Sequence, residues 1–145
     1  MPFPSRARNR VRLLLLTLVA LAVPGSPAHA AASPWFEYDQ GAVRLAAARA
    51  TVGTEEKIHL GLQFRLSPGW KIYWRSPGDA GFPPAIDWAG SVNFAGAETN
   101  WPAPERFSVL GLETVGYKHE VVLPITVALS GPGKPVGLRA RLRFL

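Results

Sequence analysis

The feature that most constrains the fold is a strict alternation of apolar and polar side chains along three segments. Every second side chain is apolar in residues 57–66, and the same period of two runs through residues 121–129 and 136–145. Successive side chains of a β-strand point to opposite faces, so this period predicts half-buried strands. Pro124 lies on the other face of the second segment, which predicts a strand near a sheet edge or a bulge.

Shorter strands are expected at residues 43–52, 70–75, 86–88 and 92–94. Residues 101–111 hold two prolines at alternate positions, a pattern that favours extended backbone outside any ladder. Turns rich in proline and glycine separate these segments at intervals of roughly ten residues, and no segment has a long helical period. The pattern predicts an all-β fold, an antiparallel β-sandwich or barrel.

Residues 1–30 are typical of a secretory signal peptide. Four arginines precede an apolar run over residues 13–23, and Pro24 and Gly25 then break the helix. A small-x-small pattern at residues 28–30 suits a signal peptidase, so we expect cleavage after Ala30 and export to the periplasm by a Sec-type route. The run is shorter than the roughly 20 residues of a spanning helix. The alternative is an uncleaved N-terminal anchor.

Composition narrows the possible functions of the remaining domain, residues 31–145. Four of the 16 basic residues lie in the leader, which leaves 12 against 10 acidic residues and removes the main argument for a nucleic-acid partner. The chain has no cysteine, so as written it holds no disulfide, Cys-based zinc site or catalytic thiol.

No motif of a known catalytic class is present. His59 lies on the polar side of its strand and His119 in an expected surface turn, which makes a weak case for metal. Four carboxylates could serve a glycoside hydrolase: Asp79, Asp87, Glu98 and Glu105. Five aromatic residues crowd the middle third of the chain: Trp70, Tyr73, Trp74, Trp88 and Trp101. They suit either a sandwich core or an exposed surface that stacks on sugars or peptides, and the core is favoured for Trp74 and Trp88.

The last strand still alternates at Leu145, with no turn or polar tail after it. A short edge strand with a frayed end and a chain that forms part of a longer protein are the two explanations.

Three blocks carry a resemblance to a known family: residues 68–81 (PGWKIYWRSPGDAG), 101–107 (WPAPERF) and 116–124 (GYKHEVVLP). In this order they resemble the periplasmic N-terminal domain of DsbD-type thiol:disulfide interchange proteins, in particular the ScsB-like branch. The resemblance covers most of residues 35–145.

The resemblance implies an immunoglobulin-like sandwich whose cysteine pair takes electrons from a membrane-embedded domain and passes them to periplasmic thiol-disulfide proteins. Such proteins serve redox homeostasis and cytochrome c biogenesis, and the parent is expected at the inner membrane. In the family the cysteine pair follows the strand that corresponds to residues 136–145. We therefore expect the chain to be a fragment that stops before its redox centre, with no reductase activity of its own.

The family also implies a cap loop that shields the cysteine pair. The matching stretch is residues 103–111, where Phe107 corresponds to the cap aromatic and Glu105 to its acidic neighbour. The family's cap is more acidic and carries a tyrosine after the phenylalanine, whereas Ser108 follows here. The alternative is that Phe107 belongs to the core. Trp101 and Tyr117 are candidates for a partner-binding surface, and no cofactor or metal is implied.

The leading hypothesis is a partner-binding, electron-relay domain of a protein-disulfide reductase. A cysteine-free exported sandwich that acts as a structural or ligand-binding module is the alternative, and a hydrolase that uses two loop carboxylates is the third.

Overall fold

The computed structural model describes residues 31–144, and the expected signal peptide lies outside them. These residues form 11 β-strands: β1 (Ala31–Ala32), β2 (Phe36–Tyr38), β3 (Gly41–Ala47), β4 (Lys57–Leu66), β5 (Lys71–Gly78), β6 (Ala85–Asp87), β7 (Gly96–Thr99), β8 (Glu105–Val109), β9 (Leu112–Lys118), β10 (Glu120–Ala128) and β11 (Arg141–Arg143). Within the described range, no helix is long and apolar enough to cross a membrane. The expectation of an all-β sandwich is confirmed.

The first layer is a sheet in the order β1-β3-β4-β10-β7, with β2 also pairing with β3. Its centre is the antiparallel β4–β10 pair, in register from Glu120 opposite Arg65 to Ala128 opposite Lys57. The inward residues of both strands form most of the buried core: Leu60, Leu62, Phe64, Val121, Leu123, Ile125 and Val127. Val43 of β3, Ile72 of β5, Tyr117 of β9 and Leu129 complete it. Burying such alternate apolar side chains on one face fixes the register, because a slip of one residue would turn them all to solvent.

The short pair β6–β11 and side chains of the neighbouring segments pack over this core. Phe144, just after β11, places its ring 5.5 Å from that of Phe64 in β4 and 5.2 Å from that of Tyr38 in β2, centroid to centroid. Trp74, Trp88 and Trp101 are half-buried against the core, which confirms the core interpretation for Trp74 and Trp88.

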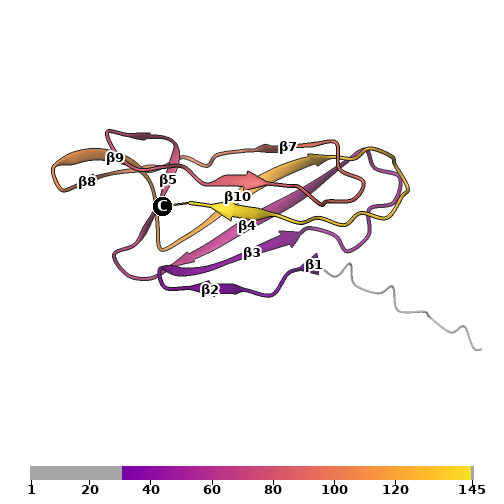
Figure 1. The fold of residues 1–145 in the computed structure, drawn as a ribbon, viewed down its shortest axis with the longest axis horizontal. Helices are drawn as coiled ribbons and strands as arrows, with labels where there is room; N and C mark the ends of the chain where they lie inside the picture. The colour runs from indigo at the N-terminus through magenta and orange to yellow at the C-terminus, as the bar shows by residue number, and fades with distance from the viewer. Residues whose placement is uncertain (1–30, 145) are drawn as a thin grey trace, which may run out of the picture.

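The remaining three strands form a separate sheet in the order β5-β9-β8, which lies at one end of the long axis of the molecule (Figure 1). The chain reaches this sheet from the core without a loop, because only His119 separates β9 from β10. The yellow arrow of β11 in Figure 1 points toward the same end.

Four expectations need correction. Residues 105–109 of the expected unpaired stretch pair with β9 as a ladder. They can do so because both prolines of the stretch precede β8, the second of them, Pro104, by one residue. Residues 92–94 form no strand: Val92 makes an isolated bridge to Gly137, and the chain pairs instead at β7.

The strand that contains Pro124 lies inside its sheet, between β4 and β7. The proline is tolerated because the β7 ladder reaches only to Ile125, one residue away, so no amide hydrogen is needed at Pro124. In the last segment only Arg141–Arg143 pair as a strand, opposite Ala85–Asp87.

Candidate functional site

The candidate site is built on the β8–β9 hairpin. Leu110 and Gly111 connect the two strands, and their φ angles of 51° and 83° suit the tight turn with two left-handed residues that matches the twist of a hairpin. The resulting register sets Phe107 opposite Thr114. Thr114 is fully buried, and its hydroxyl donates to the carbonyl oxygen of Phe107 over 2.9 Å, which holds this part of β8 in place.

Phe107 is a buried apolar residue, at 9% exposure, that lies outside the main cluster of buried side chains. Its ring lies 6.3 Å from the ring of Tyr73, and the ammonium groups of Lys71 and Lys118 lie 5.1 Å and 5.5 Å from its centroid. Phe107 is therefore covered by long polar side chains at the end of the molecule.

Glu105 lies two residues before Phe107 on the same strand, and its carboxylate is mostly in solvent. The Nζ atom of Lys118 lies 3.4 Å from its Oε2 atom, an ion pair between side chains that both remain accessible. Such pairs contribute about 0–1 kcal/mol, so this contact orients Lys118 more than it stabilises the fold.

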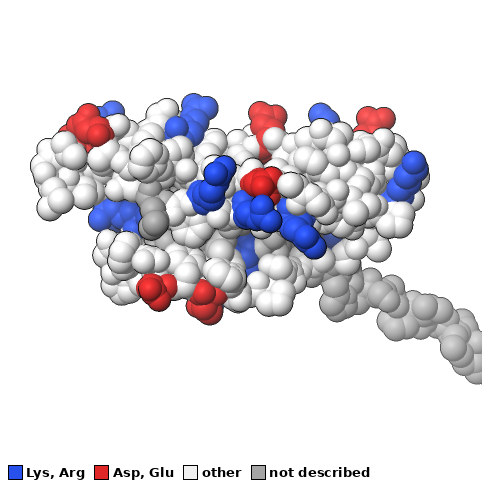
Figure 2. Space-filling model, in the orientation of Figure 1, with Lys and Arg blue, Asp and Glu red and all other residues white. Residues whose placement is uncertain are grey.

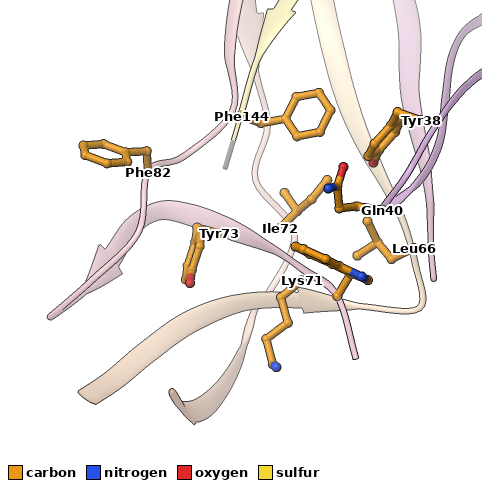
Figure 3. Close-up of a pocket in the computed structure, with 9 residues that line it drawn as sticks. Tyr38, Gln40, Leu66, Lys71, Ile72, Tyr73, Phe82 and Phe144 are labelled. Atoms are coloured by element: carbon orange, nitrogen blue, oxygen red, sulfur yellow. The ribbon is translucent and has the colours of Figure 1, made fainter. Parts of the chain in front are cut away.

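Tyr73, the aromatic neighbour of Phe107, also lines a small pocket of about 20 Å³. Tyr38, Ile72 and Phe144 line the same pocket (Figure 3). Gly81 lets the loop pass close to the Tyr73 ring, because a Cβ atom at this position would lie 2.5 Å from it. The fold thus places Phe107 and Phe144 each beside residues of β5.

The two residues expected at a partner surface lie next to this hairpin. Tyr117 is 6% exposed, and its hydroxyl donates to the carbonyl oxygen of Pro102 over 2.8 Å. Burial raises the pKa of Tyr117 to about 12, an effect that the charge of Arg75 partly offsets. Trp101 is half-buried against the core. Tyr117 presents little surface, and a role of either residue in partner binding stays a prediction.

Two of the four carboxylates proposed for a hydrolase, Asp79 and Asp87, have partners in the local structure. Asp79 accepts a hydrogen bond from the backbone of Glu113, and Asp87 accepts one from Ala89 and pairs with Arg141 at 3.5 Å. Glu98 is exposed on β7. His59 lies on β4 with its ring 3.4 Å from the hydroxyl of Thr126. Among residues 31–144, no three histidine or acidic side chains are placed to hold a metal ion.

Sequence reasoning missed Lys71, Lys118 and Tyr73 as neighbours of Phe107. The signal that could have found them is the register between β5 and β9, which sets Lys71 opposite Lys118 and Tyr73 opposite Gly116. No pattern in either segment alone reveals it.

The family model described as "Thiol:disulfide interchange protein DsbD, N-terminal" matches residues 42–145. This chain belongs to the DsbD N-terminal family. Among solved structures, the DsbD-type chain is similar to the N-terminal periplasmic domain of ScsB from Proteus mirabilis, with 31% identity and a TM-score of 0.59.

The match to the ScsB domain covers 81% of this chain and 51% of that one, so the DsbD-type chain spans about half the length of the ScsB domain. No curated protein matches it. Family and structure together confirm an immunoglobulin-like sandwich of a thiol:disulfide interchange protein.

Proposed function

We propose that the chain is the partner-binding part of a periplasmic disulfide reductase that relays electrons from a membrane-embedded donor to periplasmic thiol-disulfide proteins. The observation that carries the proposal is that Phe107 and Phe144 each lie beside residues of β5: Phe107 beside Tyr73, and Phe144 in the pocket that Ile72 and Tyr73 also line. A cysteine pair placed after the last strand, as in the family, would then follow β11 on the side of the molecule where β5 and the Phe107 hairpin lie.

The hairpin suits the control of a thiol in two ways. An apolar ring held at the end of the molecule excludes water and small oxidants from whatever lies beneath it. Nearby charge sets the thiolate fraction, since cations lower a thiol pKa and carboxylates raise it. Here Lys71 and Lys118 face a single carboxylate, Glu105, so the net local charge favours a thiolate more than an acidic cap does.

The chain itself has no cysteine and supplies no thiolate. Exchange proceeds by attack of a thiolate on a disulfide sulfur, so the residues described here act by binding and shielding. Phe107 is the shielding residue in this proposal, and Glu105 and the two lysines are positioning and tuning residues.

The test extends the chain by the residues that its gene encodes after Leu145 and measures the alkylation rate of the cysteine thiols there. We expect Phe107→Ala to accelerate alkylation severalfold, because access to the thiol rises. Phe36→Ala removes an exposed ring from β2 and is the matched control. A reading frame without cysteine codons, or equal rates in the two variants, contradicts the proposal.

A second candidate is a ligand-binding module without thiol chemistry. A groove of about 430 Å³ favours it, open between the inner face of β3 and the segment that leads into β11 and lined by apolar side chains that include Val43, Leu45, Leu138 and Leu142. Isothermal titration with peptides and glycans tests it. Heat that is lost in Leu142→Ser but kept in Phe107→Ala supports this candidate, whereas no heat with any ligand opposes it.

A further inference from the structure

A cleft of about 80 Å³ opens beside the Phe107 hairpin, between the start of β5 and the end of β9. We propose that its side chains, those of Trp70, Lys71, Lys118 and His119, form a carboxylate-binding site that receives an acidic segment of a protein partner. As a statement about the reductase's partner the inference rests on the proposed function, but the cleft itself involves no thiol chemistry.

The first observation is a like-charge pair at the centre of the cleft. Lys71 and Lys118 lie directly opposite each other in the β5–β9 ladder. Like charges in this position destabilise a sheet. Glu105 lies within 3.4 Å of Lys118, but the ammonium of Lys71 has only the carbonyl oxygen of Gly69 at 3.4 Å.

The ring of Phe107 compensates part of this repulsion, because both ammonium groups lie within the range of a cation–π contact. Two cations and one carboxylate still leave a net positive charge in the cleft. Figure 3 shows the Lys71 side chain pointing away from the pocket that Phe144 lines, so its ammonium is free of that apolar surface. An anion between the lysines would relieve the repulsion.

The second observation is backbone strain at the cleft wall. His119 has a φ of 62°, a left-handed conformation that costs a residue other than glycine about 1–2 kcal/mol. Strain of this kind collects at binding sites. This conformation leaves the imidazole of His119 exposed beside Lys118. The carbonyl oxygen of His119 accepts a hydrogen bond from the amide of Leu66, which fixes the turn.

The third observation is Trp70, which forms the apolar side of the cleft although 46% of its surface is exposed. A tryptophan beside two cations suits a segment of a protein partner that carries both carboxylate and apolar side chains. The size of the cleft suits one carboxylate at a time. On the face in Figure 2, Lys and Arg side chains lie among Asp and Glu side chains, a mixture that suits a short acidic segment better than a long polyanion.

The test is a titration of the full chain with a hexaglutamate peptide at low ionic strength, followed by NMR. We expect shifts at the Trp70 indole and the His119 amide, and Lys71→Gln/Lys118→Gln should weaken binding about tenfold, since each charge–charge contact contributes up to about 1 kcal/mol. Lys57→Gln/Lys134→Gln removes the same charge elsewhere and should bind as the parent does.

A stability measurement separates binding from folding. Lys71→Gln keeps the ion pair of Lys118 with Glu105 and relieves the like-charge contact, so we expect an unchanged or higher unfolding midpoint together with weaker peptide binding. A lower midpoint would indicate that Lys71 stabilises the fold and would overturn the assignment.

Three other results overturn the proposal. They are undiminished binding to the double lysine variant, inorganic phosphate binding as tightly as the peptide, and loss of binding in Arg139→Gln/Arg141→Gln/Arg143→Gln, which removes the three alternate arginines in and just before β11. The titration involves no thiol, so it can succeed when the alkylation test fails. In that case the cleft remains a site for acidic segments in a protein that does not exchange disulfides.

Discussion

Replacing Gly116 by alanine tests how closely the site's sheet is packed. Gly116 lies where β9 passes β5, and a Cβ atom at this position would lie 2.1 Å from the carbonyl oxygen of Ile72 and 2.9 Å from the Cα atom of Tyr73. Both obstacles are backbone atoms, which cannot rotate away. Gly116→Ala must therefore push β5 and β9 apart, and with them the lysines and the tyrosine around Phe107.

Two other strand glycines make the comparison quantitative. A Cβ atom on Gly61 would meet only a side-chain methyl of Val122, at 2.9 Å, and one on Gly96 would meet nothing within 4 Å. None of the three glycines has a positive φ, so an alanine suits the backbone conformation at each position. The three substitutions differ only in the space available.

The expected free energies follow from this space. In an open strand position alanine is about 0.5–1 kcal/mol better than glycine, so Gly96→Ala should be neutral or stabilising. Overpacking against a side chain costs about 1–3 kcal/mol, which applies to Gly61→Ala. For Gly116→Ala we expect a loss of about 3 kcal/mol or more, a large part of the roughly 5–15 kcal/mol that holds a domain folded.

The assay is urea unfolding of the three variants, followed by tryptophan fluorescence and far-UV circular dichroism and analysed as a two-state transition. The predicted order of stability is Gly96→Ala, then Gly61→Ala, then Gly116→Ala. A Gly116→Ala variant within about 1 kcal/mol of Gly96→Ala, the size of an ordinary surface change, would refute the close approach of β5 and β9.

Three further predictions concern the same end of the molecule. Because burial raises the pKa of Tyr117 to about 12, its phenol stays neutral in the fold while the unfolded phenol ionises near pH 10. The contribution of Tyr117 to stability should therefore be fully present below pH 10 and fall by about 1.4 kcal/mol per pH unit between pH 10 and 12, and Tyr117→Phe should flatten this fall in unfolding midpoints. Leu110 is 100% exposed with a positive φ, so Leu110→Asn, which suits the turn, should stabilise the domain by about 0.5–1 kcal/mol in urea, and a loss of stability would show that the leucine packs in solution. The chain without cysteine should not reduce insulin disulfides, and measurable turnover would contradict the assigned role of its residues.

The alternation of side chains predicted the central strands well because their two faces have different environments. The β4 strand has the bounds expected for residues 57–66, and the apolar positions of the 121–129 segment are the buried ones in β10. Where one face of a strand is buried against a core and the other meets solvent, the period of two indicates both the strand and which of its side chains are buried.

The site's own sheet was not predictable in this way. In β9 the buried positions include Thr114 and Gly116, which are small or polar, so the apolar pattern that marks a strand is missing. Pro102 and Pro104 hid the start of β8. β8 pairs with β9 through a hairpin, but β9 also pairs with the distant β5, and a local pattern does not record that second pairing.

Phe107 and Glu105 were found through resemblance to a family, whereas Lys71 and Lys118 were not found. Their meeting depends on the register of the β5–β9 pair and on the close passage of β5 at Gly116. A shift of two residues in that register would leave the local sequence pattern of each segment unchanged and would separate the lysines. The chemistry of the site is thus set by long-range packing of ordinary surface residues.

The single-residue junction between β9 and β10 has a consequence for how this region can change over time. With only His119 between the strands, there is no slack to absorb a gained or lost residue. A deletion anywhere from Leu112 to His119 would invert which side chains of β9 face inward relative to the strand that anchors them. Related sequences should therefore vary here by replacement at fixed length, while gaps and insertions gather in the connections on either side.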